Sequence, residues 1–148
     1  MPAPDTISDR AQQIVDEFSL FDDWMGRYEY LIELGDDMPL VEEDQKTEDN
    51  YIHGCQSDVW IQSELDDQDR VLQFRGDSNA KITKGLAALI IRVLNEQPPA
   101  VVADADFDFL DDIGLHDHLS SQRNNGLKAM IEEVRERARE TRAETEER

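Results

Sequence analysis

The sequence contains a single cysteine, Cys55, among 148 residues. One cysteine cannot form a disulfide within the chain, which is typical of proteins from reducing compartments. The longest apolar runs, such as residues 86–91, are far too short to span a bilayer. The N-terminus lacks a basic region followed by an apolar stretch, so we expect no signal peptide. These absences favour a cytoplasmic domain with no membrane partner.

Basic residues are also scarce. Lys and Arg number 15 against 35 Asp and Glu, which gives a formal net charge of −20. A surface of this sign repels nucleic acid, so we expect no nucleic-acid partner. Glycine-rich phosphate loops and paired catalytic carboxylates do not stand out in the sequence either. We therefore expect no cofactor within this chain.

The apolar residues that are present predict one compact α+β domain spanning 1–148, with a charged, frayed tail from about residue 139. Gly35 is expected to end the second helix, and Ser78 or Asn79 to cap the third. Apolar spacing predicts helices over 6–21, from 22 or 23 to 35, from 78 or 79 to 95, over 107–113, and from about 121 to 138.

A β-hairpin is predicted in the middle of the chain. Val59 and Ile61 alternate with Trp60, and Leu72 and Phe74 share one face of the returning segment. The acidic run 66–69 is the expected turn, and the irregular stretch 36–50 is expected to be a surface loop. The fold class is therefore a small antiparallel sheet packed against several helices.

Cys55 lies just before the first predicted strand, where a loop can present a side chain from a rigid base. Gly54 leaves room for a partner to approach the thiol, and Gln56 and Ser57 make its surroundings polar. A nucleophilic thiolate needs nearby positive charge, for which His53 and Arg123 are the candidates. The competing interpretation is that Cys55 is only a small buried hydrophobe.

Several motifs resemble one known family from about Asp22 to Arg137. They are YLIELG at 30–35, HGCQSDVW at 53–60, RGDSNAKI at 75–82, KGL at 84–86, HLSSQR at 118–123 and NGL at 125–127. In this order they are similar to the SufE family of sulfur acceptor proteins, including its CsdE-like members.

The resemblance implies a SufE/IscU-like fold and a persulfide carrier at Cys55. The sulfur would come from a SufS-type cysteine desulfurase, whose pyridoxal phosphate belongs to that partner, and would pass to a SufBCD-type scaffold. The acceptor would also stimulate its desulfurase. The resemblance further implies that Asp77 and Arg123 contribute to the desulfurase interface. On this interpretation the chain is a sulfurtransferase-type accessory protein, a monomer or weak homodimer, and not a stand-alone enzyme.

The persulfide on Cys55 would be prone to reduction and oxidation, so we expect it to be sheltered beneath apolar side chains at rest. Delivery of the sulfur would then require residues 50–57 to swing outwards.

Alternatives to a sulfur carrier remain open from the sequence. A regulatory adaptor would activate a desulfurase by binding, with Cys55 incidental. An iron–sulfur scaffold would need several thiolates, which one cysteine cannot supply. His116 and His118 are candidates for a cysteine hydrolase or a metal site, but residues 116–118 are more simply interpreted as a polar loop before a helix.

Overall fold

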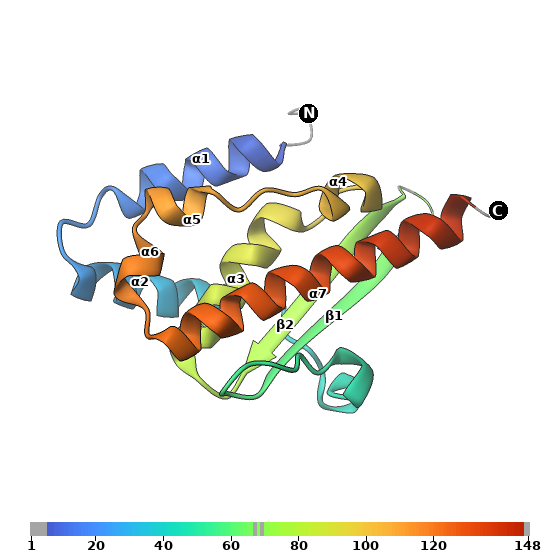
Figure 1. Cartoon of the computed structure of the whole chain (residues 1–148), viewed down its shortest axis with the longest axis horizontal. Coiled ribbons are helices and arrows are strands. Elements are labelled where there is room, and N and C mark those ends of the chain that lie inside the picture. Colours follow the sequence, from blue (N-terminus) through green and yellow to red (C-terminus); the bar gives the residue numbers. More distant parts are fainter. Residues whose placement is uncertain (1–5, 67, 69, 147–148) are drawn as a thin grey trace.

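The computed structural model describes residues 6–66, 68 and 70–146. The described residues form an α+β fold, as predicted, with one two-stranded antiparallel sheet. The elements are α1 (Ile7–Phe18), α2 (Trp24–Asp37), the 3₁₀ turns η1 (Glu43–Gln45) and η2 (Glu48–Asn50), β1 (Val59–Asp66), β2 (Val71–Ser78), α3 (Lys81–Leu94), α4 (Pro99–Ala103), α5 (Phe109–Asp112), α6 (Leu115–His118) and α7 (Ser121–Glu146) (Figure 1).

The hairpin follows the predicted alternation. β1 and β2 pair in a register that runs from Val59 opposite Ser78 to Asp66 opposite Val71. Val59, Ile61, Leu72 and Phe74 are all buried on the face towards the helices. Of the predicted turn at 66–69, Asp67 and Asp69 lie outside the described residues.

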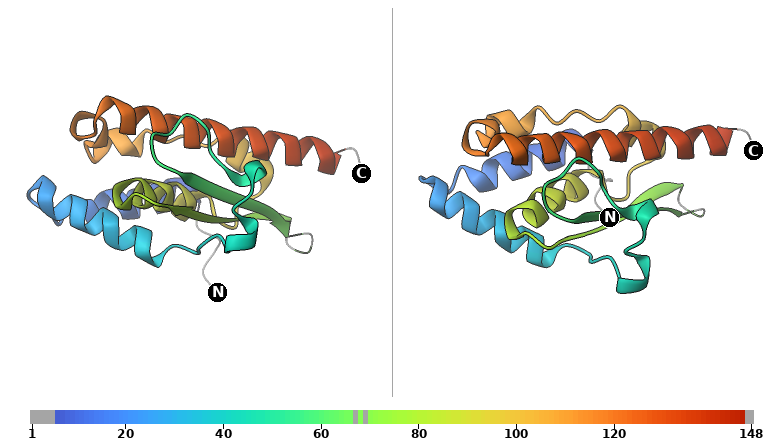
Figure 2. Two further views of the ribbon diagram at one scale, coloured as in Figure 1. Left: turned by 90° about the horizontal axis from the view of Figure 1, so that it is seen from below. Right: turned by 60° about the horizontal axis from the view of Figure 1, so that its bottom comes forward.

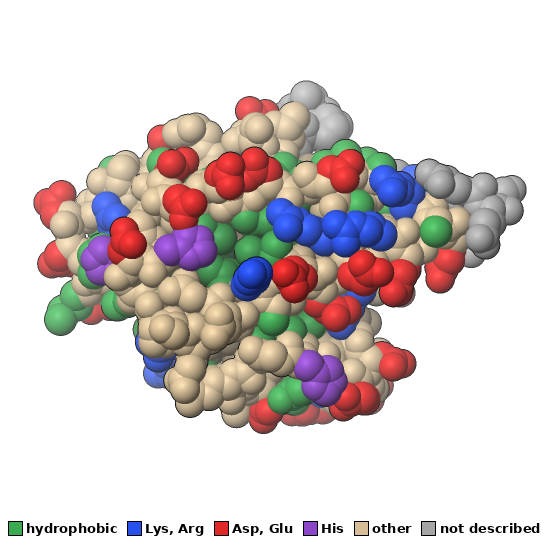
Figure 3. Space-filling model, in the orientation of Figure 1, with side chains coloured by type: hydrophobic (Ala, Val, Ile, Leu, Met, Phe, Trp, Pro, Cys, Tyr) green, Lys and Arg blue, Asp and Glu red, His purple; other side chains and the backbone are tan. Residues whose placement is uncertain are grey.

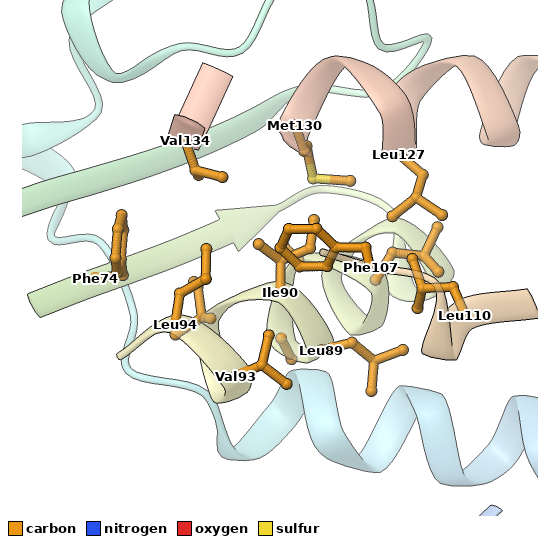
Figure 4. Close-up of a cluster of buried hydrophobic side chains, with 14 of the residues drawn as sticks. Phe74, Leu89, Ile90, Val93, Leu94, Phe107, Leu110, Leu127, Met130 and Val134 are labelled. Carbon is orange, nitrogen blue, oxygen red and sulfur yellow. The ribbon is translucent and has the colours of Figure 1, made fainter. Parts of the chain in front are cut away.

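Helix α3 is the centre of the fold. It contacts α1, α2, α7 and both strands, and Figure 2 shows α3 and the hairpin between α7 on one side and α2 on the other. Its buried residues meet the apolar face of α7 and the 107–110 segment (Figure 4). The side chains that make this contact are Leu89, Ile90, Val93 and Leu94 from α3, Leu127, Met130 and Val134 from α7, and Phe107 and Leu110. None of the helices in the described part of the chain has the length and apolar character that a bilayer crossing requires.

Gly35 does not end its helix, contrary to our prediction. Helix α2 continues to Asp37 because Gly35 is a contact point between helices. A β-carbon on Gly35 would lie 2.9 Å from the backbone nitrogen of Gly85, and one on Gly85 would overlap the carbonyl of Leu31. The pair of glycines therefore lets the backbones of α2 and α3 touch.

The start of α3 also differs from prediction. Its N-cap is Ala80, with no side-chain hydrogen bond to the helix. Ser78 Oγ instead donates to the carbonyl of Asp58 at 2.7 Å, and the amide of Asp58 donates to Asn79 Oδ1 at 3.1 Å. Both predicted capping residues thus tie the start of α3 to the chain just beyond Cys55.

Two C-terminal segments are more helical than the sequence predicts. Residues 115–118 form α6 instead of a polar loop. Helix α7 does not end near Ala138 but continues to Glu146. Ala138 is fully buried, and Arg137 and Arg139 pair with Glu133 and Glu136 one turn earlier. Contacts of this spacing support a helix whose outer face is charged.

Candidate functional site

Cys55 is held over the first part of α7 by the segment between η2 and β1. Gly54 adopts a φ of 93°, in the left-handed region where a side chain is strained. This gives Gly54 a role in backbone geometry that differs from the predicted one of easing a partner's approach. The turn brings Cys55 Sγ against Gly126, to whose carbonyl oxygen it donates a hydrogen bond of 3.5 Å.

Gly126 is the residue at this site whose importance the sequence does not reveal. A β-carbon there would lie 3.3 Å from Cys55 Sγ, so a larger residue would press on the sulfur. The NGL motif at 125–127 contains this position but does not indicate that it supports the thiol. Only the folded arrangement brings residues 55 and 126 together.

A small cavity of about 70 Å³ opens beside the thiol. Three residues predicted to surround Cys55 do line it, namely Gln56, Ser57 and Arg123. The remaining lining residues are Ala80, Thr83, Gln122 and Gly126. Most of these side chains are polar, so the shelter around the sulfur is not the apolar one that the chemistry of a persulfide predicts.

Burial raises the pKa of the Cys55 thiol. At neutral pH the resting residue is therefore a protonated thiol, which matches its role as donor to the Gly126 carbonyl. Arg123 is the cation beside this cavity, and across residues 6–66, 68 and 70–146 its guanidinium has no carboxylate partner. In the described part of the chain, a cation without a carboxylate partner thus lies at the cavity, while burial is the influence that sets the direction of the thiol pKa.

His53 is not among the residues that line the thiol cavity. Its Nε2 lies 2.6 Å from Glu48 Oε1, and its ring meets Tyr51 edge-on at 5.0 Å between centroids. It lines a separate groove along α7, of about 600 Å³, with Ala129 and neighbouring charged residues. The structure thus puts His53 next to Glu48 and not next to Cys55.

The Cys55 segment is fixed at both ends. The amide of Ile52 donates to Val59 O at 2.9 Å, and Ile52 is fully buried. The hydroxyl of Tyr51 donates to Asp58 Oδ1 at 3.0 Å. Between these anchors, the hydrogen bond from the thiol to Gly126 links the segment to α7. Residues 53–57 thus lie between two anchored ends and contact α7 through the Cys55 thiol.

Asp77 lies on β2 and is enclosed by two lysines. Its carboxylate is 2.9 Å from Lys46 Nζ and 3.6 Å from Lys84 Nζ, and its side chain is only 16% exposed. Burial alone would raise the pKa of Asp77, but the hydrogen bonds from Lys46 and the Ser78 amide and the charge of Lys84 lower it overall. Lys46, whose ammonium also lies 5.0 Å from the centre of the Trp60 ring, is not a candidate that the sequence suggests.

The two histidines of the 116–118 segment serve different contacts. His116 Nε2 lies 3.1 Å from Asp111, and His118 stacks on Trp24 with 3.8 Å between ring centroids. Neither lines the Cys55 cavity. Among the residues that the structure describes, no three His, Cys, Asp or Glu side chains gather as metal ligands would. The geometry supports neither a hydrolase dyad with Cys55 nor a metal site here.

Comparison with known proteins places this site in a recognised sequence family. The model of the SufE family, described as an Fe-S metabolism associated domain, matches residues 12–138. An uncharacterized SufE-like protein of Rhizobium etli is 40% identical over 130 residues, which cover 86% of this chain and 88% of the relative. An uncharacterized SufE-like protein of Rhizobium meliloti is 39% identical over 129 residues, 85% of this chain and 92% of the relative.

A solved structure supports the fold independently. The solution structure of a hypothetical protein from Thermus thermophilus matches with a TM-score of 0.72. The match covers 88% of this chain and 94% of the other, at 19% sequence identity. At that identity the likeness concerns the fold alone.

Proposed function

The chain belongs to the SufE family, which is associated with Fe–S metabolism, and on that premise we propose that it accepts sulfane sulfur on Cys55 from a cysteine desulfurase. The observation that carries the proposal is the setting of Cys55. The thiol lies over Gly126, beside a cavity of about 70 Å³ that is also lined by Arg123, which has no carboxylate partner among the described residues. A small cavity next to a single thiol suits the addition of one sulfur atom.

The transfer step is a thiol–persulfide exchange. The Cys55 thiolate attacks the outer sulfur of the persulfide on the desulfurase cysteine. A bond forms between Cys55 Sγ and the outer sulfur, and the bond between the two partner sulfurs breaks. The electron pair of that bond leaves on the inner sulfur, which becomes the desulfurase thiolate. The outer sulfur keeps its proton as it transfers to Cys55. The products are Cys55–S–SH and a regenerated desulfurase cysteine.

The resting state restrains this chemistry because a protonated thiol is a poor nucleophile. Cys55 reacts once a docked partner draws residues 53–57 away from Gly126 and out of the environment that raises its pKa. Arg123, at the mouth of the same cavity, then supplies positive charge for the thiolate. Reactivity is in this way tied to the presence of the partner, which limits loss of the sulfur to other thiols.

The partners in this proposal are a SufS-type cysteine desulfurase as donor and a SufBCD-type scaffold as final acceptor. Arg123 contributes to the desulfurase contact directly. Asp77 contributes after its pairs with Lys46 and Lys84 rearrange, because both lysines occupy its carboxylate at rest.

Desulfurase turnover distinguishes a sulfur acceptor from a regulatory adaptor. Alanine production from cysteine by a SufS-type desulfurase is measured with wild-type chain, Cys55→Ala and Cys55→Ser. A sulfur acceptor loses its stimulation in both variants while binding of the desulfurase, followed by calorimetry, is retained. Stimulation that survives in Cys55→Ala would contradict the carrier role and favour the adaptor.

A further inference from the structure

A second groove lies between α7 and the 104–111 segment. Its volume is about 630 Å³, a size found for ligand and peptide sites. The floor is apolar, formed by Phe107 and Leu127 with the half-buried Ile131 between the two walls. Figure 3 shows this floor as a green hollow near the centre of the face, bordered by red side chains on one side and blue on the other.

One wall of the groove is a row of carboxylates. Residues 104–108 alternate between exposed and buried, so that Ala105 and Phe107 point inwards while Asp104, Asp106 and Asp108 face solvent along one edge. Within the described part of the chain none of these three carboxylates has a cationic partner. The negative charge of Asp106 and its neighbours raises the pKa of Asp108. The edge is therefore a row of mutually repelling charges that a cation would relieve.

The opposite wall is the face of α7 that carries Lys128, Glu132 and Arg135. Arg135 spans the groove, with its Nε donating to the carbonyl of Ala105 at 3.0 Å and its guanidinium 5.5 Å from the centre of the Phe107 ring. This contact joins the two walls, so the width of the groove is set before any ligand arrives. Glu132 and Arg135 also line the groove beside His53, which makes the surface continuous across α7.

We propose that this groove binds a basic amphipathic segment of a partner protein, with apolar side chains on the floor and Lys or Arg against Asp104, Asp106 and Asp108. Charge complementarity with the aspartate wall selects this occupant, because Arg135 on the opposite wall is already engaged with the Ala105 carbonyl and the Phe107 ring. A second copy of the chain would bring another net charge of −20 to the same surface. The proposal goes beyond sulfur transfer and does not depend on Cys55.

The test uses a short synthetic peptide with leucines along one helical face and lysines along the other, and a control peptide with glutamates in place of the lysines. Binding to the full chain is followed by fluorescence anisotropy at about 0.15 M ionic strength, where weak long-range attraction is screened. Backbone amide shifts locate the contact. We expect the lysine peptide to bind, with shifts concentrated in residues 104–111 and 124–135, and the glutamate peptide not to bind.

Matched variants distinguish binding in the groove from attraction of the lysine peptide to the net negative charge of the chain. Asp106→Asn/Asp108→Asn should lower the affinity for the lysine peptide about fivefold. Glu29→Gln/Glu33→Gln removes the same charge from exposed positions on α2 and should leave its affinity unchanged within error. Ile131→Ser should weaken it about tenfold through loss of floor contact, while circular dichroism checks that the chain remains folded.

Equal losses in the two charge variants, or shifts spread over other surfaces, would overturn the proposal. Absence of binding by the lysine peptide would do the same. Sedimentation of the wild-type chain tests the other occupant: a dimer that Ile131→Ser dissociates would assign the groove to a second copy and contradict a basic segment. The sulfur-transfer proposal is unaffected by all of these results, because none of them measures Cys55.

Discussion

Glycine has different roles where α2 crosses α3 and where Cys55 contacts α7. At the crossing, Gly35 and Gly85 let two backbones touch, and a β-carbon on Gly85 would overlap the Leu31 carbonyl. At the contact of Cys55 with α7, Gly126 makes room for the sulfur. A β-carbon on Gly126 would lie 3.3 Å from Cys55 Sγ. The first contact is between the backbones of two helices, whereas the second is with a side chain on the loop between η2 and β1.

The two regions also differ in how deeply their side chains are buried. Residues around the crossing are deeply buried, including Leu31 and Leu86. Around the thiol the lining side chains are mostly polar, and a single hydrogen bond from the thiol to the Gly126 carbonyl joins Cys55 to α7. Substituting glycines in the two regions should therefore affect different observables.

The largest effect is expected from Gly85→Ala. The new methyl group meets the Leu31 backbone, which cannot move without separating α2 from α3. Overpacking of this kind lowers the free energy of unfolding by about 3 kcal/mol, which exceeds the gain of about 1 kcal/mol from replacing glycine in a helix. Urea denaturation followed by circular dichroism measures the change. A loss below about 1 kcal/mol would show that the crossing is not rigid.

Gly126→Ala makes the same substitution in α7 and should act mainly on chemistry. The gain in helix propensity and the strain against Cys55 Sγ offset each other, so stability changes by less than about 1 kcal/mol. The displaced thiol loses its contact with the Gly126 carbonyl, and its alkylation by iodoacetamide becomes faster. Slower alkylation together with a large loss of stability would contradict the expectation that the Cys55 side chain yields to the new methyl group.

The alkylation rate of Cys55 should depend on pH differently in the folded and unfolded chain. Because burial raises its pKa in the folded chain, alkylation should reach half of its maximal rate at a higher pH in native protein than in urea. The linked stability is fully present below the unfolded thiol pKa and is lost as pH rises through the folded pKa. Alkylation of native protein over about pH 7 to 10 covers the window around the ordinary thiol pKa. A native midpoint at or below that of the unfolded chain would contradict a protonated resting thiol.

The smallest effect is expected from Lys46→Met. It removes one of the two cations beside Asp77 while Lys84 remains. We expect a loss of about 0.5 kcal/mol in urea denaturation, reduced further at high salt. Arg139→Met, which breaks the exposed pair with Glu136, is the matched control and should change stability less. An equal loss in both variants would argue against a special role for the Lys46–Asp77 pair.

Much of the fold follows from local patterns. The alternation of Val59, Trp60 and Ile61 predicts the strand face that is buried, and the helical spacing of Leu86, Leu89 and Ile90 predicts the central helix. These patterns predict the elements correctly because one face of each strand or helix packs against the same hydrophobic core.

What the sequence could not predict depends on contacts between distant residues. Gly35 matches a helix stop until Gly85 is known to lie against it, so the tertiary contact overrides the local signal. The same holds at the site. Cys55 is identified from its neighbours and family motifs, but its raised pKa, the support from Gly126 and the pairing of His53 with Glu48 all arise from folding.

If Cys55 itself carries the sulfur, intact-protein mass spectrometry will detect the added atom. The chain is mixed with a SufS-type desulfurase and free cysteine, and its mass is recorded before and after reductant. We expect a gain of one sulfur atom that reductant removes and that is absent in Cys55→Ala. A competent desulfurase that binds the chain but leaves its mass unchanged would contradict the carrier role.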